Sequence, residues 1–162
     1  MEEKLSLYEK IVHIHKVDIF KTLDINELAA IAGISEEIVY PEAKIVFFEG
    51  DVSETMYIAV TGQLKVSRNN TELGRFKSGD SFGLSAFLLD DKRLVTCTTL
   101  EETRLLVIHK REFEEMLMEY PQISLELARI QAKMLQRLLD RTDSSKDTKG
   151  YALADFFNRQ SR

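Results

Sequence analysis

What this chain of 162 residues lacks already excludes several classes of protein. Its single cysteine, Cys97, cannot form an internal disulfide, which fits a reducing compartment. No run approaches the roughly 18 apolar residues that a membrane-spanning helix needs. Residues 1–10 hold three glutamates and no apolar stretch, so we do not read them as a signal peptide. Low-complexity segments and long internal repeats are missing as well. We expect a cytoplasmic protein, or the soluble part of a larger one, without direct membrane insertion.

The composition is that of one globular domain with an acidic charge balance. Hydrophobic residues make up 44% of the chain and charged residues 30%, which is enough apolar material for a buried core. The net charge of −5, from 27 acidic and 22 basic residues, argues against general affinity for nucleic acid or anionic lipid. We therefore expect no DNA binding by this chain.

The first 33 residues have the apolar spacing of helices. Asp24 is a candidate N-cap, and Glu27 follows three residues later, which is the spacing of a capping box. Gly33 is expected to end that helix, because glycine is the residue that most readily leaves helical geometry. The sequence thus predicts a helical lead-in over residues 5–33.

The middle of the chain, from Glu36 to Ile108, has the period-two alternation of β-strands. The predicted strands are short and rich in β-branched and aromatic residues: Ile38–Tyr40, Lys44–Phe48, Met56–Thr61, Gln63–Ser67, Glu72–Phe76, Arg93–Thr99 and Arg104–Ile108. Turn signals that contain glycine or asparagine separate them. We predict an α+β fold that is mainly β, a jelly-roll-like β-roll of about eight strands, with helices before it and two helices after it.

The segment Gly79–Ile108 holds the parts of an anion cradle. It reads as a strand, a glycine turn, one short helical turn, an acidic loop with a single arginine, and two further strands. Gly83 lets the backbone approach a ligand closely, and the free N–H groups of Leu84–Phe87 are expected to point at a negative charge. Arg93 offers a fork of donors that suits phosphate.

Four local phrases match the pattern of a known family. They are Phe48-Glu49-Gly50-Asp51 before a strand, Met56-Tyr57-Ile58 leading to Gly62, Gly79-Asp80-Ser81-Phe82-Gly83, and Leu100-Glu101-Glu102-Thr103 before the last strand. With the order of elements, they resemble the cyclic nucleotide-binding domain over roughly Val17 to Leu139. The resemblance implies a non-catalytic regulatory or sensor module. Its implied ligand is cyclic AMP, cyclic GMP or another phosphate-bearing molecule, and no other cofactor is implied.

In that family's phosphate-binding cassette, a glutamate after the Phe-Gly pair holds the ribose 2′-hydroxyl, and an arginine holds the cyclic phosphate. This chain keeps the arginine as Arg93, but Leu84 stands in the glutamate position. Lys92 replaces a common proline, and Val95 replaces the usual alanine. Loss of a charged hydrogen bond worth about 1.5–3 kcal/mol weakens binding roughly ten- to a hundredfold. The implied ligand-binding residues are Phe82, Gly83, Leu84, Ser85, Ala86, Arg93, Leu94 and Val95.

The same residues have a plainer interpretation. Asp90 and Asp91 lie close enough in sequence to pair with Arg93 in an empty site, and Leu84 can simply be buried under the edge of the barrel. On this interpretation the domain binds no nucleotide. It then serves as a dimerisation or protein-interaction module, as one part of a larger protein.

The final helix offers a dimer seam. Pro121 suits its first position. Apolar residues follow with the three-four spacing of a heptad: Leu125, Ala128, Ala132, Leu135 and Leu139. The family's corresponding helix often makes a dimer, so we expect a homodimer through this stripe. The alternative is one wide apolar face that the tail covers.

We expect one domain over residues 1–142, with the lead-in at 5–33, the β-roll at 36–108 and the C-terminal helices at 110–141. A polar linker and a short apolar tail fill residues 143–162. The apolar residues of that tail are Tyr151, Leu153, Phe156 and Phe157.

Other candidate sites are weak. His13 and His15 form an H-x-H, but two residues of a helix that lie two apart diverge, so we expect no metal. His109 and Cys97 suit structural roles at a strand end and within an apolar strand. The histidines of a cupin-type enzyme, a nucleophile elbow and a P-loop are all missing. We therefore do not expect an enzyme.

Overall fold

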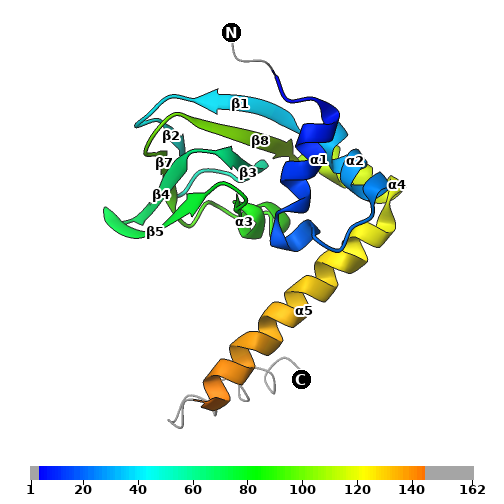
Figure 1. The fold of residues 1–162 in the computed structure, drawn as a ribbon. Helices are drawn as coiled ribbons and strands as arrows, with labels where there is room; N and C mark the ends of the chain where they lie inside the picture. The colour runs from blue at the N-terminus through cyan, green and yellow to red at the C-terminus, as the bar shows by residue number, and fades with distance from the viewer. Residues whose placement is uncertain (1–3, 145–162) are drawn as a thin grey trace. The chain divides into compact units, whose positions relative to one another are not determined.

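The structure, a computed structural model, describes residues 4–144. Its helices are α1 (Leu7–His15), the 3-10 helix η1 (Asp18–Phe20), α2 (Ile25–Ile34), α3 (Leu84–Leu88), α4 (Lys110–Glu119) and α5 (Pro121–Ser144). Its strands are β1 (Glu36–Tyr40), β2 (Ile45–Phe47), β3 (Thr55–Thr61), β4 (Gln63–Arg68), β5 (Thr71–Lys77), β6 (Ser81–Phe82), β7 (Thr96–Thr99) and β8 (Thr103–His109). Helices therefore precede and follow a mainly β domain, as predicted (Figure 1).

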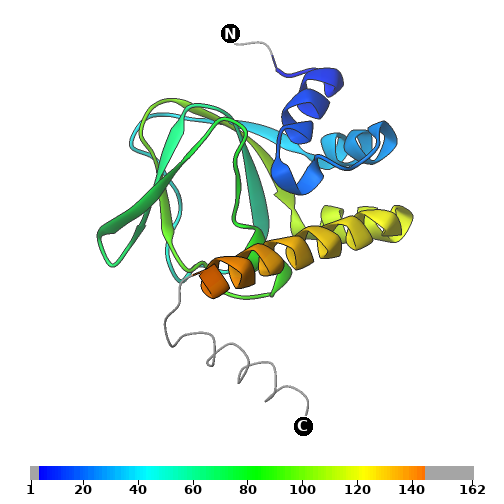
Figure 2. The same ribbon diagram turned by 60° about the horizontal axis from the view of Figure 1, so that its bottom comes forward.

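The eight described strands form two antiparallel four-stranded sheets. One sheet has the order β1-β8-β3-β6 and the other the order β2-β7-β4-β5, so the chain crosses repeatedly between them (Figure 2). Neighbouring strands in a sheet are mostly distant in sequence, which is typical of a jelly roll and not of a simple meander. The predicted β-roll is confirmed.

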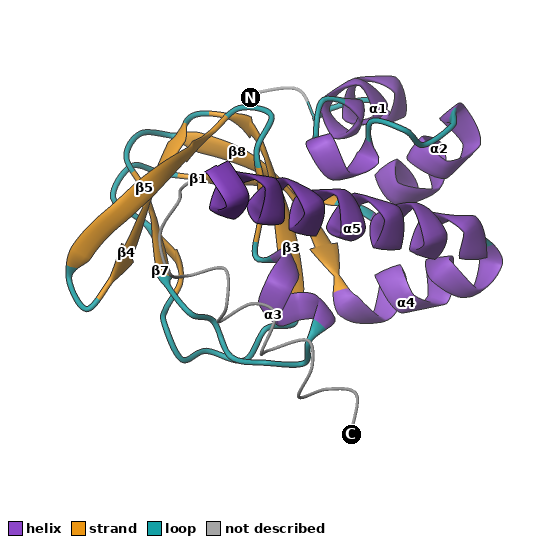
Figure 3. Cartoon of the chain, turned by 90° about the horizontal axis from the view of Figure 1, so that it is seen from below, coloured by secondary structure: helices purple, strands orange, loops and turns teal. Residues whose placement is uncertain are grey.

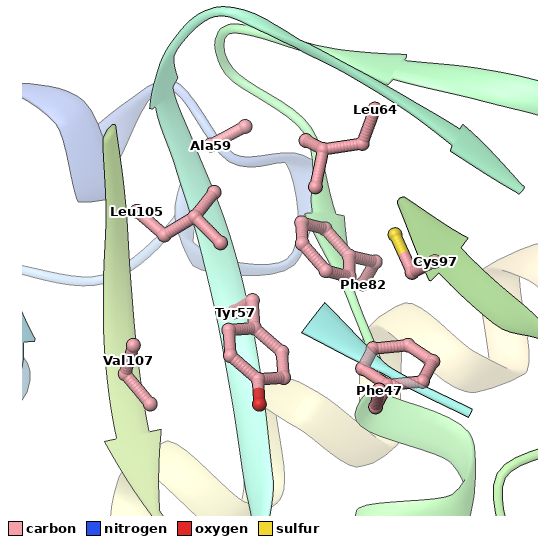
Figure 4. Packing of buried hydrophobic residues seen from close by; sticks show 8 residues of the cluster. All are labelled: Phe47, Tyr57, Ala59, Leu64, Phe82, Cys97, Leu105 and Val107. Carbon is pink, nitrogen blue, oxygen red and sulfur yellow. The ribbon is translucent and has the colours of Figure 1, made fainter. Parts of the chain in front are cut away.

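Apolar side chains from both sheets meet inside the roll (Figure 4). The buried cluster consists of Phe47, Tyr57, Ala59, Leu64, Phe82, Cys97, Leu105 and Val107. In β3 and β8, residues on both sides of the strand are buried, because α1, α2 and α4 lie against the sheet that holds them. Those strands therefore read as nearly continuous apolar runs, whereas the exposed β5 does not.

The predicted start of α2 is confirmed in detail. The Asp24 carboxylate accepts hydrogen bonds from the backbone N–H groups of Asn26 and Glu27 at 2.8 and 2.9 Å. The Glu27 carboxylate in turn accepts from the Asp24 N–H at 2.8 Å. The predicted end is wrong: α2 continues through Gly33 to Ile34, and Gly33 has no positive φ. The backbone leaves the helix one residue later than the glycine.

The predicted strand Arg93–Thr99 is too long. β7 begins only at Thr96, and the backbone of Arg93 pairs instead with the turn before β3. The Arg93 N–H donates to the Asp51 carbonyl, and the Gly50 N–H donates to the Arg93 carbonyl, both at 2.8 Å. This pairing fixes the backbone of Arg93 at the entrance to the roll.

The C-terminal helices follow the predicted pattern. Phe113 and Met116 of α4 are buried, and Pro121 opens α5. One compact unit of the structure ends at Ser124 and holds both sheets and α1–α4, and a second unit begins at Leu125. Within residues 4–144, no helix has the length and apolar character needed to cross a membrane. The tail residues Tyr151, Leu153, Phe156 and Phe157 lie outside the described residues.

Candidate functional site

Arg93 is the chemical centre of the predicted cassette, and its side chain is almost fully buried, with 4% of its surface exposed. One terminal nitrogen, Nη1, donates to the Gly83 carbonyl at 3.0 Å. The other, Nη2, donates to the backbone carbonyl of Thr55 and to its hydroxyl oxygen, the latter at 3.0 Å. The guanidinium therefore links the glycine turn to the start of β3.

Two aromatic rings contact the same guanidinium. Its central carbon lies 4.3 Å from the ring centre of Phe47 and 5.7 Å from that of Tyr57. Both distances allow a cation–π attraction, which strengthens when the cation is shielded from water. The cation thus rests on the aromatic part of the core instead of extending into solvent.

The predicted ion pair of Arg93 with Asp90 or Asp91 is wrong. Asp90 pairs with Lys110, and the Asp91 carboxylate accepts from the backbone N–H of Lys92 at 2.7 Å. Both aspartates are exposed, and Asp90 has a positive φ of 55°. Arg93 is therefore held by carbonyl oxygens and aromatic rings. None of the contacts described above joins its guanidinium to a carboxylate.

One nitrogen of Arg93 has no partner. Nε is buried and makes no hydrogen bond in the structure. An unpaired buried donor costs on the order of 1–3 kcal/mol, more when it belongs to a charged group. Burial also lowers the pKa of Arg93, because desolvation penalises the charged form. The structure thus holds a desolvated cation with spare donor capacity inside the β-roll.

Gly83 makes room for this arrangement. Its φ is 82°, in the left-handed region that favours glycine, and a Cβ there would come within 2.5 Å of Arg93 Nη1. The sequence predicted that Gly83 lets a ligand approach. In the structure it is the Arg93 guanidinium that uses the space. The glycine remains essential to the site, for a reason internal to the protein.

The remaining predicted ligand-binding residues surround this pair. Ala86 and Phe82 are buried, Leu84 and Val95 are half-buried, and Ser85 and Leu94 are exposed. Leu84 is therefore at the edge of the roll and not fully covered. α3 has only five residues, so its macrodipole is small and the guanidinium is the main positive group of the site. Figure 3 shows α3 beside β3, next to the start of α4.

The aromatic rings fill the roll beneath Arg93. Phe82 stacks on Tyr57 at 5.1 Å and on Phe76 at 4.8 Å between ring centres, and Phe47 lies 5.7 Å from Tyr57. Thr55, Phe47 and Tyr57 were not predicted as site residues. The alternation of the β-strands was the only sequence signal that Phe47 and Tyr57 face inward. The hydrogen bond between Thr55 and Arg93 joins residues 38 positions apart, which no local pattern predicts.

Comparison with known proteins now identifies the fold and its family. Residues 37–120 match the family model described as the cyclic nucleotide-binding domain. The chain belongs to that family. A cyclic nucleotide-binding domain is a regulatory module, and the matched range includes the whole cassette, with Gly83, Leu84 and Arg93.

The curated relatives are longer proteins, and only a part of each aligns with this cyclic nucleotide-binding domain. It is 28% identical over 101 residues to a Drosophila melanogaster cGMP-dependent protein kinase, covering 62% of this chain and 9% of the kinase. It is 24% identical over 102 residues to the Thermus thermophilus cyclic AMP receptor protein, covering 60% of this chain and 47% of the relative. The chain thus spans less than half the length of either relative.

Solved structures show the same fold. The N-terminal domain of a transcriptional regulator from Streptomyces coelicolor superposes with a TM-score of 0.74 at 22% identity, covering 80% of this chain and 94% of that one. The regulatory domain of Toxoplasma gondii PKA, crystallised with cAMP, superposes with a TM-score of 0.64 at 22% identity, covering 72% and 46%.

The weaker candidate residues of this cyclic nucleotide-binding domain are His109, His13 and Cys97, and the buried Nδ1 of His13 has no hydrogen-bond partner. His109 Nε2 lies 3.2 Å from a Glu36 carboxylate oxygen, and His13 is half-buried in α1. Burial raises the pKa of the Cys97 thiol to about 12, which makes it unreactive at neutral pH. Among the described residues, no group of three or more histidine, cysteine, aspartate or glutamate side chains is placed to hold a metal.

Proposed function

We propose that this domain is a regulatory sensor that binds a phosphate-bearing ligand, cyclic AMP or cyclic GMP, through Arg93 and the turn at residues 83–86. The observation that supports this most directly is the buried Nε of Arg93, which lacks an acceptor. An anionic oxygen beside Nε would supply the missing partner and neutralise a desolvated charge. Cyclic GMP and cyclic AMP are the nucleotides in the names of a kinase relative and a receptor relative.

Leu84 sets the expected affinity. An apolar side chain at this position leaves the ribose 2′-hydroxyl without the carboxylate that the family's glutamate provides. We expect binding roughly ten- to a hundredfold weaker than in a cassette with the glutamate. The proposal therefore predicts a ligand that is held mainly by its phosphate.

The decisive variant restores the carboxylate. Leu84 is half-buried at the edge of the roll, so Leu84→Glu can be made without opening the core. Isothermal titration with cyclic AMP and cyclic GMP should show binding that tightens about tenfold or more in Leu84→Glu. Leu84→Gln is the matched control, because it has a similar shape and lacks the charge.

A second control changes the ligand. The gain in Leu84→Glu should disappear with 2′-deoxy cyclic AMP, because the new carboxylate then has no hydroxyl to accept from. Arg93→Lys keeps the positive charge and loses the fork, so it should weaken all of these ligands. If neither the natural chain nor Leu84→Glu binds either nucleotide at millimolar concentration, the proposal is wrong.

The second candidate is a module that acts only in assembly, and a separate observation favours it. Leu125 and Leu135 are 52% and 41% exposed in the structure, and Ala128 and Ala132 are exposed between them. Leu139 is half-buried. An exposed apolar stripe with heptad spacing is the typical seam of a helix pair. We infer that α5 mediates a homodimer.

Sedimentation velocity tests the seam directly. The double variant Leu125→Glu with Leu135→Glu should convert a dimer to a monomer, because four like charges would face one another in the pair. Lys133→Gln with Arg137→Gln changes the net charge by the same amount at heptad positions b and f, away from the seam, where both side chains are exposed. That control should remain dimeric. A dimer that forms equally with and without cyclic nucleotide favours the assembly role over the sensor role.

A further inference from the structure

A groove lies between α2 and α4, away from the residues of the cassette, with a volume of about 320 Å³. The two helices pack side by side within the first compact unit (Figure 1). The residues that line the groove are Ala30, Ile34, Glu112, Glu115, Met116, Glu119 and Tyr120. An apolar floor is thus combined with three carboxylates. Neither the ligand site nor the α5 stripe makes use of it.

The carboxylates share one face of α4. Glu112, Glu115 and Glu119 follow at i, i+3 and i+7, with Met116 on the same face. All three glutamates are exposed. Glu115 accepts a hydrogen bond from Arg111 at 3.0 Å in a pair that is largely open to water, and the charge of Glu112 also acts on Arg111. None of the described residues that line the groove is basic. The groove therefore has a negative potential over its apolar floor.

Both properties suit one kind of occupant. We propose that this groove docks a basic amphipathic helix from a partner protein, with apolar side chains on Ala30, Ile34 and Met116 and lysine or arginine side chains beside the glutamates. Glu112 and Glu119 are about 10 Å apart along the axis of α4, which equals the rise over two turns of a partner helix. Basic residues seven apart on that helix can thus face both carboxylates.

The test uses a labelled probe peptide of about 18 residues, with leucine on one helical face and lysine on the other. Fluorescence anisotropy measures its affinity for the full chain. Amide shifts in ¹⁵N NMR spectra show where the peptide lies. The triple variant Glu112→Gln, Glu115→Gln and Glu119→Gln should weaken binding about tenfold or more, because each exposed ion pair contributes up to about 1 kcal/mol.

A matched triple controls for net charge. Glu42, Glu101 and Glu102 are exposed on loops outside the groove, and their replacement by glutamine changes the charge of the chain by the same amount. This control should change the affinity by less than about threefold. A groove-filling variant, Ala30→Phe, should weaken binding with every carboxylate in place, after circular dichroism has shown that it folds.

Three outcomes support the proposal when they occur together: amide shifts confined to α2 and α4, a loss in the groove triple, and retention in the control triple. Equal weakening by both triples would reduce the interaction to net charge and overturn it. Amide shifts elsewhere on the domain would also overturn it. The same holds if a peptide with glutamate in place of lysine binds more tightly, or if the lysine probe does not bind at millimolar concentration.

Discussion

Replacement of Gly83 by alanine tests how the site is built. The residue has a φ of 82°, and its new Cβ would lie 2.5 Å from Nη1 of Arg93 and 3.4 Å from the Thr55 carbonyl oxygen. Two penalties therefore add. The left-handed backbone costs an alanine about 1–2 kcal/mol. Displacing the guanidinium costs a further 1.5–3 kcal/mol or so, the worth of a charged hydrogen bond.

Gly79→Ala is the natural control. Gly79 also has a positive φ, 91°, but a Cβ there would meet nothing within 4 Å. It should lose only the backbone term, about 1–2 kcal/mol. Urea unfolding followed by circular dichroism measures both variants, with the slope m checked for constancy. Gly83→Ala should lower the free energy of unfolding by roughly 2.5–5 kcal/mol in total.

A double-mutant cycle isolates the contact. In an Arg93→Ala background the guanidinium is gone, so Gly83→Ala should lose no more stability than Gly79→Ala does. The coupling between positions 83 and 93 is expected at about 1.5–3 kcal/mol. Equal losses for the two glycine variants, with no coupling to Arg93, would refute the inward placement of the guanidinium.

Three further predictions concern other parts of the molecule. Asp24→Ala removes the acceptor of two backbone N–H groups at the start of α2 and should lower the free energy of unfolding by about 1–2 kcal/mol in urea. Burial lowers the pKa of His13 below its usual 6.5, so the folded state favours the neutral ring. The contribution of His13 to the free energy of unfolding should therefore be fully present above pH 6.5 and should fall as the pH drops below 6.5. The dependence of the free energy of unfolding on pH should be weaker in His13→Gln. Cys97 should react with iodoacetamide at pH 8 only in urea, since its pKa is about 12.

Contrary results are equally specific. Unchanged stability of Asp24→Ala would show that the capping box contributes nothing to α2. An identical pH profile in His13→Gln would assign the acid dependence to other groups. Rapid alkylation of the folded protein would show that Cys97 is open to solvent.

Local rules explain why much of the fold was predictable. The spacing of Asp24 and Glu27 identifies the start of α2, because capping depends only on residues three apart. Pro121 identifies the start of α5 for a similar reason. Gly33 misled the prediction, since a glycine costs a helix only about 1 kcal/mol and the buried Ile31 and Ala32 of the same helix hold α2 in place.

The arrangement of the site was less predictable, because it depends on residues far apart in the chain. Sequence spacing paired Arg93 with Asp90 and Asp91. The structure instead places it against Thr55, 38 residues away, and on the ring of Phe47. The pairing of Lys110 with Asp90 likewise joins two segments 20 residues apart. The pairing of strands in the two sheets determines which side chains meet inside the β-roll. A local sequence pattern does not contain this pairing.

The central claim is that the cassette binds cyclic nucleotide through Arg93 in spite of Leu84. The most direct measurement is isothermal titration of the natural chain and of Arg93→Lys with cyclic AMP and cyclic GMP. The natural chain should bind saturably with a Kd between about 10 μM and 1 mM, and the affinity should fall at least about tenfold in Arg93→Lys. No heat at millimolar nucleotide, or equal affinity of the two proteins, would contradict it.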